Sequence, residues 1–82
     1  MVERVKEVLS QAFPGMNVDA IRTTSSGRVA GRVEWDGFAD MDDVERQEHI
    51  RAVLRSQMGA KFHEVSILLA YTPDELWAMQ AV

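Results

Sequence analysis

The chain has 82 residues, which fits one domain over residues 1–82 and leaves no room for a second. Its 46% hydrophobic and 27% charged residues are the balance of a globular protein and not of a disordered one, and the absence of cysteine excludes disulfides and any metal centre built on the chain's own sulfur. The net charge of −4 argues against nucleic acid, no apolar run is long enough for a membrane span, and the charged N-terminus is unlike a signal peptide, so we expect a cytoplasmic protein.

The first part of the chain predicts a helix followed by a β-hairpin. Apolar residues recur at helical spacing over residues 2–13, and Pro14-Gly15 ends the helix. Residues 17–23 predict a strand of mixed polarity, and residues 24–27 a polar turn. Over residues 29–35 apolar and polar side chains alternate, which is typical of a half-buried strand. We expect the two strands to pair through the short turn.

A long amphipathic helix is predicted next. Its apolar positions run from Met41 and Val44 to Met58, Asp40 is placed to cap its start, and Gly59 ends it. The opposite face of this helix is charged, as expected for a surface in contact with water.

A third strand and a last helix complete the chain. The strand at residues 65–71 is apolar on both of its faces, so we expect it between or beside the hairpin strands, the centre of the sheet being the best candidate, with both faces largely covered. Thr72, Pro73 and Glu75 have the pattern of a capping box with proline in the first helical position. On the helix that follows, we expect Trp77 to pack against the sheet; the alternative is an exposed position at an interface.

These elements follow one another in the order α-β-β-α-β-α. The long helix between the second and third strands predicts a parallel pairing through a right-handed crossover. The sequence therefore predicts an α+β fold, a three-stranded mixed sheet with helices on one face.

The run at residues 62–76 (FHEVSILLAYTPDEL) resembles the BolA-like family, in which a histidine opens the last strand and a Thr-Pro-acid-Glu turn follows it. Trp35-Asp36-Gly37 resembles the aromatic-x-Gly end of the family's second strand, and Val44-Glu45-Arg46 resembles the start of its central helix. The likeness extends over nearly the whole chain and is closest to the acid-stress-protein branch. It implies a fold of the class-II KH type.

The resemblance also implies a partner and a cofactor. BolA-like proteins pair with monothiol glutaredoxins and share a bridging [2Fe–2S] cluster with them, and His63 matches the family's ligand histidine. Since this chain has no sulfur ligand, it holds no cluster alone. The chain departs from the family at three places: Gln47 stands where many members have histidine, the hairpin at residues 23–31 has neither histidine nor cysteine, and the connection at residues 37–44 is longer and more acidic.

The alternative is a KH-like nucleic-acid-binding regulator of transcription. It depends on Arg22, Arg28 and Arg32, which we expect to form a basic patch on one face of the hairpin. Gly27 and Gly31 do not make the Gly-x-x-Gly clamp of RNA-binding KH domains, which favours the adaptor.

We do not expect an enzyme. Nucleophile–base pairs, phosphate-binding loops and metal-ligand clusters at recognised spacings are not found in the sequence. His49 lies among glutamates on the central helix, and we expect it to face water. The aspartates at positions 36, 40, 42 and 43 lack the spacing of a calcium loop and are typical of a helix start. The sequence thus predicts a protein that acts by binding, in iron–sulfur or redox homeostasis or in the stress response.

Overall fold

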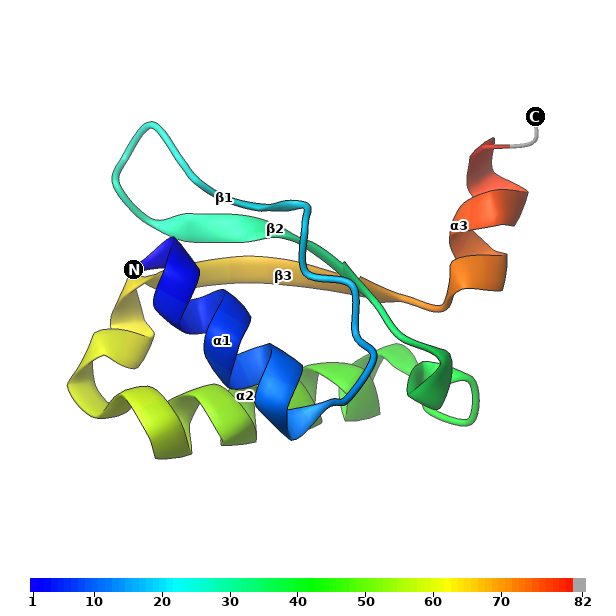
Figure 1. Ribbon diagram of the computed structural model, residues 1–82, viewed down its shortest axis with the longest axis horizontal. Helices are drawn as coiled ribbons and strands as arrows, with labels where there is room; N and C mark the ends of the chain where they lie inside the picture. Colours follow the sequence, from blue (N-terminus) through cyan, green and yellow to red (C-terminus); the bar gives the residue numbers. More distant parts are fainter. Residues whose placement is uncertain (81–82) are drawn as a thin grey trace.

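The computed structural model describes residues 1–80, which fold into helices and strands in the predicted order (Figure 1). The elements are α1 (Val2–Ala12), β1 (Ile21–Thr23), β2 (Val29–Glu34), the 3₁₀ turn η1 (Asp36–Phe38), α2 (Asp43–Met58), the 3₁₀ segment η2 (Gly59–Glu64), β3 (Val65–Tyr71) and α3 (Pro73–Gln80).

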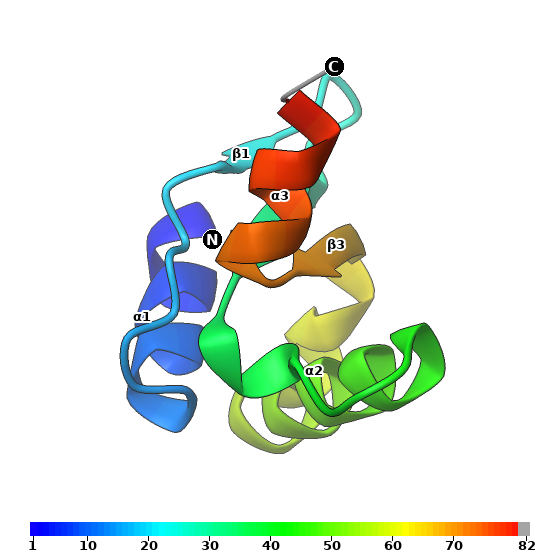
Figure 2. The same cartoon turned by 90° about the vertical axis from the view of Figure 1, so that its right-hand side faces the viewer.

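The three strands form one mixed sheet in the order β1-β2-β3. β1 and β2 pair antiparallel as the predicted hairpin, and β2 and β3 pair parallel, as predicted from the long helix between them. β1 is shorter than predicted, because residues before it make only an isolated bridge from Asn17 to Glu34. Helices α1 and α2 lie side by side on one face of the sheet (Figures 1 and 2). The α+β fold class is confirmed.

The third strand lies beside the hairpin, one of the two positions predicted for it, but the preferred central position and the two covered faces are wrong. β3 is an edge strand, and β2 takes the centre because it joins β1 through the hairpin and β3 through the crossover. One face of β3 is buried, with Leu68 2% exposed. The other face is not covered, and Ile67 and Leu69 are 61% and 43% exposed. Apolar residues on both faces of the strand therefore did not mean that both faces are covered.

The hydrophobic core lies between the covered face of the sheet and the two long helices. Its most deeply buried side chains come from each of these elements: Val5 and Leu9 of α1, Val29 and Val33 of β2, Ile50 and Leu54 of α2, Leu68 of β3, and Phe38 of η1. The buried positions of the helices recur three and four residues apart. This is the spacing of apolar residues on which the sequence prediction of these helices depended.

The start of α2 differs from the prediction. Asp42, and not Asp40, is the N-cap, and its carboxylate accepts a hydrogen bond of 2.8 Å from the backbone N–H of Glu45. The turn at η1 continues to Met41, whose N–H donates to the Phe38 carbonyl, so the helix begins two residues later than expected. Val44 lies on the exposed side of the helix, at 66% exposure, because the buried stripe of α2 runs through Arg46, Ile50 and Leu54.

The other predicted helix ends are confirmed. Gly59 ends α2 with a φ of +57°, a conformation that glycine adopts without a steric cost. At the start of α3, the Thr72 hydroxyl accepts from the Glu75 N–H at 3.1 Å, and the Glu75 carboxylate accepts from the Thr72 N–H at 2.9 Å. This is the reciprocal pair of a capping box.

Helix α3 does not join α1 and α2. It rises from the end of β3 on the opposite side of the sheet (Figures 1 and 2). Within α3, Leu76 is the buried residue, whereas Trp77 is 72% exposed. The prediction that Trp77 packs on the sheet is therefore wrong. Helix α3 starts at the end of the sheet and runs away from it. None of the helices in residues 1–80 has the length and apolar composition needed to cross a bilayer.

Candidate functional site

One edge of the sheet is not paired with another strand in the part of the chain that the structure describes. β3 pairs with β2 on one side, and helix α2 runs below its other side. Two side chains of α2 donate to carbonyls along this edge: Gln47 Nε2 to Leu68 at 2.7 Å and Arg46 Nη1 to Ala70 at 3.1 Å. The helix is thereby joined to the strand edge by hydrogen bonds as well as by apolar packing.

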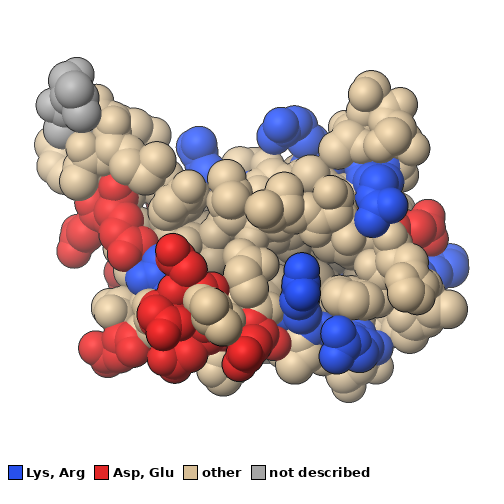
Figure 3. Space-filling view, turned by 180° about the vertical axis from the view of Figure 1, so that it is seen from behind, with Lys and Arg blue, Asp and Glu red and all other residues tan. Residues whose placement is uncertain are grey.

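A groove of about 730 Å³ lies along this edge, between β3 and α2. Gln47 and Arg51 line it from the helix, and Ser66 and Leu69 line it from the strand. Acidic side chains gather toward the end of this face below α3, and basic side chains gather toward the opposite end (Figure 3). The two ends of the groove therefore carry opposite charge. This would favour one orientation of an elongated partner bound in the groove.

His63 lies at the basic end of the groove, in η2, just before β3 begins. Its backbone carbonyl accepts a hydrogen bond of 2.9 Å from Arg28 Nη2, which ties η2 to the start of β2. The residue is exposed, and its imidazole has no hydrogen-bond partner within residues 1–80. Both ring nitrogens can therefore be offered to a ligand, while the backbone is held in place.

Arg28 and Arg51 add positive charge near His63. Both line the groove, and Arg55 lies on the ring of Phe62 with its guanidinium carbon 5.2 Å from the ring centroid. Such a cation–π contact orients the side chain without neutralising it. An anionic group on a partner would be attracted to this end of the groove.

At the opposite end of the groove, the buried Arg46 forms an ion pair with the partly exposed Glu75. Arg46 is 5% exposed, and its guanidinium donates to both carboxylate oxygens of Glu75, at 2.7 and 3.0 Å. It also donates to the Met41 carbonyl and lies 5.6 Å from the centre of the Phe38 ring. The hydrogen bond to Arg46, supported by the Thr72 N–H, lowers the pKa of Glu75 to about 2, and the same pair raises the pKa of Arg46.

The three arginines predicted as one nucleic-acid patch are divided by the structure. Arg22 pairs with Ala30 across the hairpin and, with Arg32, lies on the uncovered face of the sheet. Arg28 turns toward η2 and the groove, beside His63. The expected patch is therefore two separate groups of cations.

Two residues of the groove were missed in the sequence. Gln47 and Arg51 were assigned to no site, yet they border the same helical stripe as the buried Ile50 and Leu54. Each lies three residues before one of these apolar positions, and this spacing is the signal that would have placed them at the edge of the buried face. That Gln47 reaches Leu68, 21 residues away, follows only from the fold.

At this end of the groove, His63 can supply one ligand to a metal ion, and the described residues that line the groove beside it supply no others. Within residues 1–80 no group of three or more His, Cys, Asp or Glu side chains is placed to hold a metal ion. A neutral imidazole nitrogen is a suitable ligand for iron. A [2Fe–2S] cluster at His63 would therefore need its remaining ligands from a partner.

Comparison with models of known protein families finds no match for this chain, and no curated protein is detectably similar to it in sequence. The resemblance to the BolA-like family thus depends on the residues quoted above.

Proposed function

We propose that the protein is a cytoplasmic, non-enzymatic adaptor or regulator that binds a partner protein along the groove between β3 and α2. The observation that carries the proposal is the state of His63, which is exposed at the groove's end, has an uncommitted imidazole and lies on a backbone fixed by Arg28. A side chain of this kind is poised for a ligand outside its own chain, because it pays little conformational cost on binding.

A monothiol glutaredoxin is the partner that the resemblance favours, in iron–sulfur or redox homeostasis or in the stress response. His63 would hold one iron of a shared [2Fe–2S] cluster, and the partner's thiolate and its thiol cofactor would supply the other ligands. A neutral nitrogen in place of a thiolate raises the reduction potential of such a cluster. Arg28 and Arg51 would attract the partner's acidic groups and set its orientation.

The test is to mix the protein with a cluster-loaded monothiol glutaredoxin and to record the visible absorbance and circular dichroism. We expect a complex whose spectrum differs from that of the glutaredoxin alone. His63→Ala should leave the fold intact, because no buried volume is lost, and should change the spectrum of the shared cluster.

His49→Ala is the matched control, since His49 is exposed on α2 and does not line the groove. It should give the wild-type spectrum. If His63→Ala forms the same complex with an unchanged spectrum, His63 is not a ligand, and if no complex forms with the wild-type protein, the glutaredoxin proposal is wrong.

The second candidate is a nucleic-acid-binding regulator, favoured by the arginines Arg28 and Arg51 in an elongated groove. Phosphate contacts release counterions, so this binding would weaken steeply as salt is added. Fluorescence anisotropy with labelled single-stranded and duplex oligonucleotides, measured at several salt concentrations, separates the two candidates. Binding that is lost in Arg28→Ala and Arg51→Ala, but kept in His63→Ala, would favour the nucleic-acid reading.

A further inference from the structure

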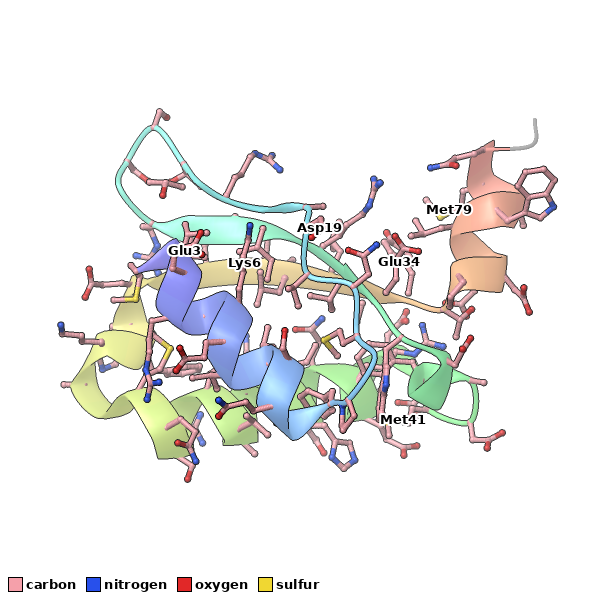
Figure 4. All side chains as sticks on the ribbon, viewed as in Figure 1. Glu3, Lys6, Asp19, Glu34, Met41 and Met79 are labelled. Atoms are coloured by element: carbon pink, nitrogen blue, oxygen red, sulfur yellow. The ribbon has the colours of Figure 1, made fainter. Side chains whose placement is uncertain are left out.

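Apolar side chains are exposed on two surfaces that lie on the same side of the molecule. The first is the uncovered face of the sheet, where Ile67 and Leu69 are exposed beside Ala30 of β2. The second is α3, where Trp77 and Met79 are largely exposed. Both surfaces lie opposite α1 and α2 (Figures 1 and 2), and Met79 projects from α3 on the side where Glu34 of β2 lies (Figure 4).

Helix α3 cannot cover the sheet of its own chain. Thr72 is the single residue between β3 and α3, and so short a link does not let a helix turn back over the strand that precedes it. The capping box and the Arg46–Glu75 ion pair hold the first turn of α3 at the end of the sheet. The two apolar surfaces of one molecule are therefore kept apart by its own geometry.

The two surfaces are both apolar, and they carry charges of opposite sign. The sheet face carries the exposed Arg22 and Arg32 beside its apolar residues, with the half-buried Glu34 near Asn17 at one end. Helix α3 has no lysine or arginine, and its first turn carries the exposed Asp74, whereas the charge of Glu75 is paired with Arg46 of the same chain. A basic apolar face and an acidic apolar helix suit each other as an interface.

We propose that two copies of the chain associate about a two-fold axis, with α3 of each copy packed on the uncovered sheet face of the other. A two-fold axis makes both contacts equivalent and closes the assembly at two copies. Helix α3 has eight residues and is therefore about 12 Å long, so each contact is small and the pair lies at the low end of specific interfaces. The dimer should accordingly be concentration-dependent. The proposal concerns the chain alone and does not depend on a glutaredoxin.

Sedimentation equilibrium over a range of concentrations provides the first test. We expect the average mass to rise from the monomer's 9.3 kDa toward twice that value. Trp77→Glu and Ile67→Asp should each weaken association about tenfold or more, because each places a charge at the centre of the contact. Both residues are exposed, so the circular dichroism spectrum and the unfolding transition of the single molecule should be retained.

Val44→Glu is the matched control, because Val44 is an equally exposed apolar residue on α2, on the other side of the sheet. It should dimerise like the wild-type protein. A protein that stays monomeric at all concentrations overturns the proposal. So does a dimer that Trp77→Glu and Ile67→Asp leave unchanged, or one that Val44→Glu disrupts equally.

Disulfide crosslinking tests the reciprocal arrangement itself, and the cysteine-free chain makes it clean. Single-cysteine variants Ile67→Cys and Met79→Cys are oxidised separately and then as a mixture. In the mixture we expect mainly disulfides that join an Ile67→Cys molecule to a Met79→Cys molecule. The reason is that α3 of one copy lies on the sheet of the other. Crosslinks that form mainly between identical variants would indicate sheet-to-sheet or helix-to-helix contact and would overturn the proposal.

Discussion

Leu68 and Leu69 are neighbours in the sequence with opposite surroundings. Leu68 points into the core between the sheet and α2, whereas Leu69 lies on the uncovered face. Along a strand, successive side chains point to opposite faces, so the two positions report separately on the two sides of the sheet.

We therefore expect Leu68→Asp to unfold the domain and Leu69→Asp to leave it folded. The first substitution buries an unpaired charge and should cost about 4 kcal/mol or more, a large share of the roughly 5–15 kcal/mol that stabilises a domain. Urea denaturation followed by circular dichroism measures both variants. A stable Leu68→Asp variant would contradict this placement of β3.

The Arg46–Glu75 pair predicts how stability depends on pH. The pKa of Glu75 is lowered from an ordinary 4.5 to about 2, so between these values the unfolded chain binds more protons than the folded one. The stabilisation is fully present above pH 4.5 and is lost as the pH falls toward 2. Glu75→Gln should be less stable than the wild type at pH 7, with a difference that shrinks over this range.

Urea titrations at pH 7 and at pH 3 measure this effect. Asp74→Asn, which removes the neighbouring exposed acid, is the control and should keep the wild-type pH dependence. If Glu75→Gln and the wild type lose stability in parallel as the pH falls, the ion pair does not carry the pH dependence.

At the scale of elements, the connection from β2 to α2 depends on a packed aromatic turn. The Trp35 indole N–H donates to the Pro14 carbonyl at 2.9 Å, and its ring makes edge contacts with Phe13 and Phe38. Gly37 lies against the face of this ring, where a Cβ atom would overlap the indole carbons. The aromatic-x-Gly pattern of the sequence thus has a steric reason.

Gly37→Ala should destabilise the domain by about 1–3 kcal/mol, because an added methyl group must displace a ring that is fixed on several sides. Asp36→Ala, in the same turn but exposed, should change the free energy of unfolding by no more than about 0.5 kcal/mol. Thermal and urea unfolding of the two variants measure the difference. Equal stabilities would show that the indole moves aside without cost.

At the scale of the whole molecule, local signals predicted the elements well and long-range contacts poorly. The bounds of β3, the glycine end of α2 and the capping box of α3 were all readable, since each depends on residues within a few positions of one another. The N-cap of α2 was misplaced by two residues, because η1 was not foreseen. The preferred central position of β3 in the sheet was wrong, because an apolar strand face is the same in sequence whether another element covers it or not.

The candidate site divides in the same way. His63, just before β3, was singled out in the sequence by its match to the family's ligand histidine. Its neighbours in the groove were not, because Arg28 directly precedes β2 and Arg51 lies in α2, and only the parallel crossover brings these segments together.

The sequence by itself determined the order of elements, most of their ends and the α+β class, because apolar periodicity and capping act over a few residues. Tertiary structure alone decided which strand became the edge, that Arg46 is buried against Glu75, and that α3 stands away from the sheet with Trp77 exposed. These outcomes depend on contacts between residues far apart in the chain, 29 positions for Arg46 and Glu75 and 37 for Gly31 and Leu68. Such contacts are set by how all the elements pack at once, and no local pattern records them.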